Sequence, residues 1–170
     1  MKIISRDTNY TLLIIQLVII TLFIISVVFG FINTRDYLNL TENYNRITPL
    51  FEIIISTPFF KSIIFLLIPT IGIFLRNKIG WILMTSFFYF LFTYFLFSFI
   101  AFDHIQLPDV LIFTVIIVCI GLIIIAMNTK NISLIKYNIQ RRLIISYNIV
   151  AYIIGVAITI YIAYLSYPII

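Results

Sequence analysis

Long apolar runs alternate with short polar connectors along this chain, and the runs set the predicted elements. A membrane-spanning helix needs about 20 mostly apolar residues. Five runs fit such helices, at residues 11–32, 58–75, 80–102, 110–127 and 144–167. The predicted fold is therefore an all-α integral membrane protein, a single domain over residues 1–170 built as a bundle of five transmembrane helices.

Arg76 and Lys78 interrupt the second and third runs, and this pair decides the predicted orientation. The polar stretch is too short for a domain and too costly in hydrocarbon, so it predicts a tight turn. Because cations prefer the cytoplasmic side, the turn is placed inside, and the other connectors then alternate. Eight cations fall inside and Arg35, Arg46 and Lys61 fall outside. The inner cations are Lys2, Arg6, Arg76, Lys78, Lys130, Lys136, Arg141 and Arg142. A multi-pass protein of the cell membrane is predicted, with a cytoplasmic N-terminus and an outer C-terminus.

Two connectors carry apolar residues of their own. The outer loop at 33–57 includes "TPLFEIIIS", which predicts a short interfacial helix at 49–56. The alternative is a continuation of the second span with a kink at Pro58. The inner connector "KNISLIKYNIQRR" mixes isoleucine and leucine with cations. It is either an interfacial segment that faces anionic lipid or an ordinary inner loop.

Composition supports the membrane prediction. Hydrophobic residues make up 63% of the chain, charged residues 10%, and the mean hydropathy is +1.19. A typical soluble domain is about 25% charged, so these charges are too few to cover a globule in water. The net charge of +5 does not predict nucleic-acid binding, because the cations are spread over short connectors. The predicted partners are the lipid bilayer and another membrane protein.

Candidate chemistry is sparse. Ionisable groups inside a membrane usually mark function, yet the apolar runs hold almost none. Asp103, His104 and Asp109 in "FDHIQLPD" form the one candidate polar site, either a hydrolase or metal site or simply a polar hairpin turn. The hairpin turn is preferred, so no metal and no cofactor are predicted. Cys119, the only cysteine, cannot form an intramolecular disulfide and is expected to be a buried, inert thiol.

Helix packing leaves a clearer pattern. The fifth run has small side chains at a strict four-residue spacing, which lines one face of a helix and allows close approach of a neighbouring backbone. These residues are Ala151, Gly155, Thr159 and Ala163. The third run is instead rich in aromatic residues, of which one stripe is expected to face the bundle. That stripe is Phe88, Phe92, Phe95, Phe99 and Phe102. The deep amides Gln16 and Asn148 are expected to hydrogen-bond neighbouring helices.

The functional prediction follows from two observations: the apolar runs hold few reactive or ionisable side chains, and the fifth run has a face of small residues suited to helix packing. It is a small multi-pass membrane protein without catalytic machinery, an accessory or immunity-type protein that binds another membrane component. The alternative is a small transporter or a substrate-binding membrane subunit. A second alternative is a membrane enzyme that uses Asp103, His104 and Asp109 on the outer face.

Overall fold

The computed structural model describes residues 10–40, 58–101, 107–129 and 131–166, and the regular structure in these ranges is entirely helical. The elements are α1 (Tyr10–Leu40), α3 (Pro58–Phe74), α4 (Lys78–Ala101), α5 (Leu107–Met127), the short helices η1 (Asn131–Lys136) and η2 (Arg141–Leu143), and α6 (Ile144–Ser166). Four stretches within the described residues are long and apolar enough to cross a membrane: Tyr10–Ile32, Lys78–Ile100, Val110–Met127 and Arg141–Tyr164. The all-helical prediction is confirmed for this part of the chain, and the four helices indicate a membrane protein.

The helix bounds differ from the predicted spans in two places. The apolar stretch of membrane-spanning length ends at Ile32, but the chain stays helical through Leu40, past the predicted start of a loop at residue 33. Residues 33–40 contain neither glycine nor proline, so no residue there stops a helix. At the other difference, α5 begins at Leu107, so Asp109 belongs to its first turn. The predicted interfacial helix at 49–56 lies outside the described residues.

The turn predicted at Arg76 and Lys78 is present between α3 and α4, at residues 75–77. Asn77 explains why α4 starts here. Its side-chain Oδ1 accepts hydrogen bonds from the backbone N–H groups of Ile79, at 3.0 Å, and Gly80, at 3.1 Å. An asparagine that satisfies these otherwise unpaired donors is a favoured N-cap. The hydrogen bonds of Asn77 thus fix the residue at which α4 begins.

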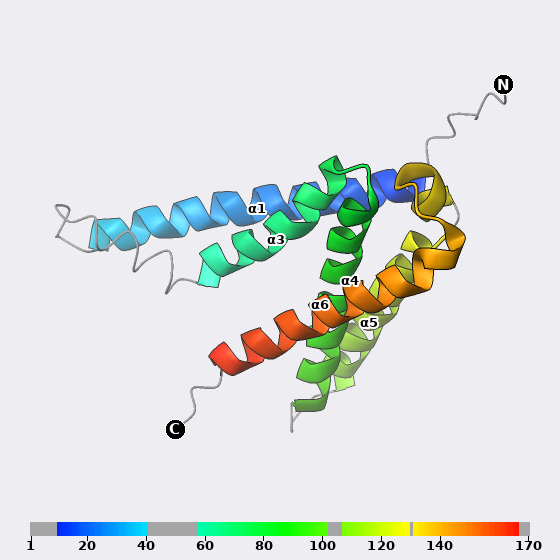
Figure 1. Cartoon of the computed structure of the whole chain (residues 1–170). Coiled ribbons are helices and arrows are strands. Elements are labelled where there is room, and N and C mark those ends of the chain that lie inside the picture. Colours follow the sequence, from blue (N-terminus) through cyan, green and yellow to red (C-terminus); the bar gives the residue numbers. More distant parts are fainter. Residues whose placement is uncertain (1–9, 41–57, 102–106, 130, 167–170) are drawn as a thin grey trace.

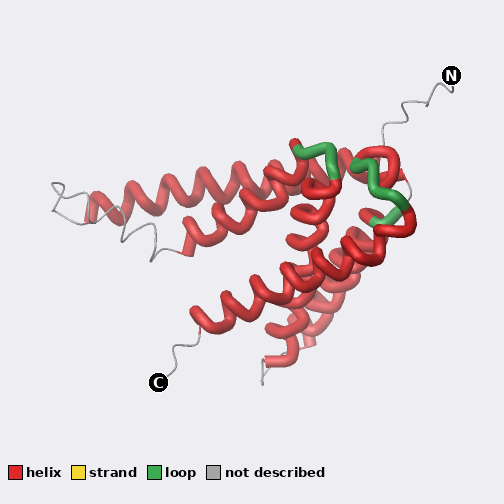
Figure 2. The backbone as a smooth tube through the Cα atoms, in the orientation of Figure 1, coloured by secondary structure: helices red, strands yellow, loops and turns green. Residues whose placement is uncertain are grey.

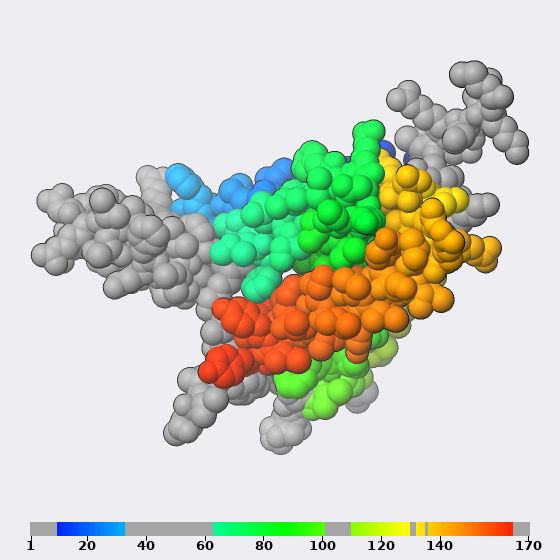
Figure 3. Space-filling view, in the orientation of Figure 1, coloured from blue at the N-terminus to red at the C-terminus, as the bar shows by residue number. Residues whose placement is uncertain are grey.

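Helix α4 is the centre of the structure, since it packs against α3, α5 and α6, while α1 packs mainly against α3. Its aromatic rings reach each of these neighbours. Phe90 stacks on Phe65 of α3, with ring centroids 5.6 Å apart, and Tyr89 meets Tyr152 of α6 edge-on at 5.5 Å. Phe95 contacts Phe113 of α5 at 6.1 Å. Figure 3 shows α3 and α6 covering one face of α4.

The helices converge at one end and spread toward the other (Figure 1). The start of α1, the turn between α3 and α4, the end of α5 and the segment 131–143 gather there, and Figure 2 shows loops at this end. Interactions between the helices agree with this arrangement, because Trp81 near the start of α4 bonds to Met127 at the end of α5. We call this the charged end. Its described cations are Arg76, Lys78, Lys136, Arg141 and Arg142.

Cys119 corrects one expectation. The cysteine is exposed on the outer surface of α5 rather than buried. Most of α5 is exposed in the same way, and Val115, Val118 and Leu122 each leave more than half of their surface uncovered. An apolar run alone does not show which face a residue occupies, because a helix in lipid is apolar on all sides.

Candidate functional site

The small side chains predicted as a seam on α6 lie against α4. Ala151 is fully buried, Gly155 and Thr159 are buried, and Ala163 is half-buried toward the far end of the helix. A Cβ atom on Gly155 would lie 2.7 Å from the backbone nitrogen of Phe90 and 2.9 Å from the carbonyl oxygen of Ser86. The α4 backbone therefore occupies the space that any larger side chain on Gly155 would need.

A hydroxyl pair extends this crossing. The Oγ1 atoms of Thr93 and Thr159 lie 2.6 Å apart, and either can donate the hydrogen bond. Each hydroxyl also lies within hydrogen-bonding distance of a carbonyl oxygen in its own helix, Tyr89 at 2.9 Å and Gly155 at 3.2 Å. The seam thus combines close backbone approach with a polar link between the two helices.

A second close crossing, which the sequence analysis did not identify, joins α3 to α4. A Cβ on Gly72 would lie 2.8 Å from the carbonyl oxygen of Gly80 and 3.2 Å from the backbone nitrogen of Met84. Both glycines are buried. Pro69 lies one turn before Gly72, and α3 continues through it as a helix. The hydroxyl of Thr70 donates to the carbonyl of Leu66 at 2.7 Å.

Three polar side chains form a cluster where α4, the end of α5 and α6 meet: Tyr89 of α4, Asn128 just after α5, and Asn148 of α6. Asn148 donates from Nδ2 to Oδ1 of Asn128, and its own Oδ1 accepts from Asn128 Nδ2 at 3.3 Å and from the Tyr89 hydroxyl at 3.2 Å. The amide of Asn128 is also within 2.8 Å of the carbonyl oxygen of Ile124. These groups satisfy one another, so the cluster holds the helices together instead of presenting free donors. The predicted bond from Asn148 to a neighbouring helix is present, to Tyr89 of α4, and Asn128 is a further member that the sequence pattern does not mark.

The connector between α5 and α6 folds against the helices. Ile132, Tyr137 and Ile139 are almost fully buried, whereas Leu134 is exposed. Asn138 adopts a left-handed backbone conformation, with φ of 55°, between two of these buried residues. Asparagine tolerates this conformation better than most residues. Of the connector's described apolar side chains, all but Leu134 thus cover the ends of the helices instead of forming an exposed apolar face.

Tyr137 is the polar centre of this covering segment. Its hydroxyl donates to Sδ of Met84 at 2.8 Å. Burial raises the pKa of Tyr137 to about 12, although a hydrogen bond with the side chain of Gln16 acts in the opposite direction. Nearby, the indole N–H of Trp81 donates to the carbonyl oxygen of Met127 at 3.0 Å. These bonds join α1, α4, α5 and the connector at the charged end.

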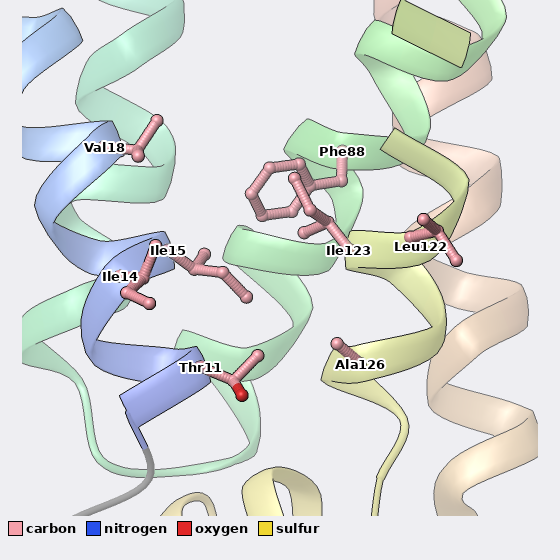
Figure 4. A pocket seen from close by; sticks show the side chains of 8 residues that line it. All are labelled: Thr11, Ile14, Ile15, Val18, Phe88, Leu122, Ile123 and Ala126. Carbon is pink, nitrogen blue, oxygen red and sulfur yellow. The ribbon is translucent and has the colours of Figure 1, made fainter. Parts of the chain in front are cut away.

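An apolar cleft of about 420 Å³ separates α1 from α5 beside this end. Figure 4 shows α1 and α5 as its two walls and Phe88 of α4 between them. The residues that face it include Thr11, Ile15 and Val18 of α1, Phe88 of α4, and Ile123 and Ala126 of α5. The hydroxyl of Thr11 is the one polar side-chain group among the lining residues. The cleft can therefore bind an apolar ligand, but it offers almost no hydrogen-bond donors or acceptors to a polar one.

The candidate polar site predicted at Asp103, His104 and Asp109 cannot be assembled from the described residues. Asp103 and His104 lie outside them, and Asp109 is placed only as part of the first turn of α5. Within the described ranges, no three histidine, cysteine or acidic side chains come together to hold a metal. Thr85 is the only buried side chain there whose polar atom, Oγ1, has no hydrogen-bond partner.

The residues predicted to set the topology all lie at the charged end. Arg76, Lys78, Arg141 and Arg142 are exposed, and Arg142 donates from Nε to Oε1 of Gln140 at 2.9 Å. Their side chains therefore project from the helix ends, where headgroups or water can solvate them.

No protein-family model matches the chain, and neither a curated protein nor a solved structure shows significant similarity to it.

Proposed function

We propose that this protein is a small multi-pass membrane protein that works by binding another membrane component, as an accessory or immunity-type protein, without catalytic machinery. The observation that carries this proposal is how the polar groups inside the described helices are used. Asn128, Asn148 and Tyr89 bond to one another, and so do Thr93 and Thr159. Side chains spent on internal bonds are poor candidates for substrate chemistry, whereas they suit a rigid scaffold.

The surface of α1 is the contact region we favour. Leu17, Leu22 and Ile25 are exposed along it, and the helix has one main neighbour, α3. In lipid, association between helices depends on close packing and hydrogen bonds instead of apolar burial from water. A loosely held helix at the edge of the structure leaves room for such packing by a partner.

Site-specific photo-crosslinking in the native membrane tests this proposal. A photoreactive residue at Leu22 should give one discrete crosslinked product, while the same residue at Ile153 of α6 should not. Both side chains are exposed. Uniform crosslinking at the two positions, together with substrate uptake by the purified protein in liposomes, would favour the transporter. Loss of function in His104→Ala with normal expression would favour the enzyme.

We further propose that the chain crosses the cell membrane five times, with the charged end in the cytoplasm and the C-terminus outside. Helix α3 has 17 residues, which at 1.5 Å per residue is about 25 Å. That length is near the lower limit for a span. Its packing against both α1 and α4, two helices of spanning length, supports a fifth crossing.

Cysteine labelling tests this orientation. In a Cys119→Ser background, Asn77→Cys should react with an impermeant thiol reagent only after the inner face is opened. Asn77 is exposed in the turn at the charged end. Labelling of Asn77→Cys in intact cells would show that the topology is the reverse of the one proposed. A phosphatase reporter after Ile170, active only outside the cytoplasm, checks the number of crossings independently.

A further inference from the structure

The cleft between α1, α4 and α5 has a size and a lining that restrict what can fill it. Its volume of about 420 Å³ lies in the range of ligand pockets. One turn of an α-helix, about 10 Å wide and about 5.4 Å long, occupies roughly the same volume. A partner helix that spans the bilayer could therefore seat only one turn there. A single flexible hydrocarbon chain is narrower and could follow the cleft.

The lining selects for hydrocarbon as well. Ile14, Ile15 and Val18 form one wall, and Leu122 and Ile123 form the other, with Phe88 between them. Isolated polar groups that lose water need hydrogen-bond partners, and this cleft supplies only the Thr11 hydroxyl. A polar ligand would lose its hydrogen bonds to water and find almost none in the cleft. An acyl chain has no hydrogen bonds to lose.

The position of the cleft points to the charge of the attached headgroup. Thr11 and Ala126 mark one end of the cleft (Figure 4), and they lie near the start of α1 and the end of α5. That is the charged end, with five described cations: Arg76, Lys78, Lys136, Arg141 and Arg142. The described charges at the opposite ends of α1, α3 and α5 cancel, because Asp36 and Asp109 are balanced by Arg35 and Lys61, whereas the described charges of the charged end are all positive. Cations beside a membrane attract anionic headgroups.

We propose that this cleft binds one acyl chain of an anionic phospholipid, whose headgroup lies among the cations of the charged end. Hydrocarbon between α1 and α5 fills a gap where these two helices make few contacts of their own. The lipid thus acts as a structural component that joins α1 to α5. This role is independent of the partner that we propose for the protein.

Native mass spectrometry of the full-length protein in mild detergent tests the proposal, with phosphatidylglycerol and phosphatidylcholine as the probes. The wild type should retain one phosphatidylglycerol molecule and prefer it over phosphatidylcholine by about fivefold or more, the effect of a single surface cation. Ala126→Phe should fill the cleft and lower this retention by about tenfold. Ala157→Phe is the matched control, since Ala157 is exposed on α6 and outside the cleft.

A second pair of variants guards against a folding defect. Val18→Phe should narrow the cleft from its opposite wall. Val28→Phe is its control, because Val28 lies farther along α1 and outside the cleft. Val18→Phe should lose the lipid and Val28→Phe should retain it, with unchanged helicity in both. Equal retention in all four variants would overturn the proposal, as would equal retention of the two lipids. Loss of a dimer instead of a lipid in the cleft variants would also overturn it and assign the cleft to a second copy of the chain.

Discussion

Thr93 and Thr159 face each other across the crossing of α4 and α6, with their hydroxyl oxygens 2.6 Å apart. Hydrogen bonds between membrane helices contribute on average about 0.6 kcal/mol, and at most about 2 kcal/mol. We expect a coupling energy in this range from a double-mutant cycle with Thr93→Val and Thr159→Val. The unfolding free energies are measured by titrating SDS into mild detergent. Strictly additive effects would mean that the two hydroxyls do not bond.

The same substitution at Thr85 should have the opposite effect. Thr85 is fully buried, and its Oγ1 has no hydrogen-bond partner. Valine has nearly the same shape and removes the unsatisfied group, so Thr85→Val should leave stability unchanged or raise it by about 1 kcal/mol. The SDS titration used for Thr159→Val gives the comparison. A loss as large as that of Thr159→Val would show that Thr85 has a bonding partner in the membrane.

Gly155→Leu should destabilise the fold strongly. The side chain would enter the space held by the α4 backbone at Ser86 and Phe90. Overpacking of this kind costs about 1–3 kcal/mol. The measurement is thermal aggregation in detergent, with Ile153→Leu as the control, because Ile153 is exposed on the same helix. If the two variants aggregate at the same temperature, the close approach of α4 and α6 is absent in solution.

Tyr137 should make stability depend on alkaline pH. Its pKa rises to about 12 in the folded chain from an ordinary value of 10.0, because burial disfavours the phenolate. The stability that it contributes is therefore complete below pH 10.0 and declines as the pH approaches about 12. Wild type should exceed Tyr137→Phe by about 1 kcal/mol at neutral pH, through the hydroxyl hydrogen bonds. That difference should shrink above pH 10.0.

The difference in melting temperature between wild type and Tyr137→Phe is the quantity to follow, because the two proteins differ in this phenol alone. Melting temperatures by circular dichroism at pH 7 to 11.5 provide it, and the ordinary tyrosine pKa of about 10 sets where the change begins. A constant difference across this range would show that the phenol is not buried in the folded protein.

The sequence predicted the helical elements well where length and hydropathy decide the structure. The tight turn at Arg76 and Lys78 is present, as the two cations between apolar runs predicted. Small residues at four-residue spacing also marked the α6 face that lies against α4, since a single helix fixes that geometry.

Features that depend on two or more helices could not be predicted in this way. The pairing of Asn128 with Asn148 requires the relative rotation of α5 and α6, which no local pattern contains. The prediction that Cys119 is buried was wrong for the same reason: apolar residues line all sides of α5, so the sequence does not show which side is exposed. The crossing of Gly72 and Gly80 could have been suspected, since each glycine stands near one end of the α3–α4 turn.

Trp81 gives the molecule a built-in optical reporter. It is the only tryptophan of the chain, its ring is fully buried, and its indole N–H bonds to the carbonyl of Met127. All native tryptophan fluorescence therefore comes from the contact between the start of α4 and the end of α5. Separation of these helices would expose the indole and move its emission to longer wavelength. The unlabelled wild-type protein can thus report on the state of its charged end in any membrane in which it is studied.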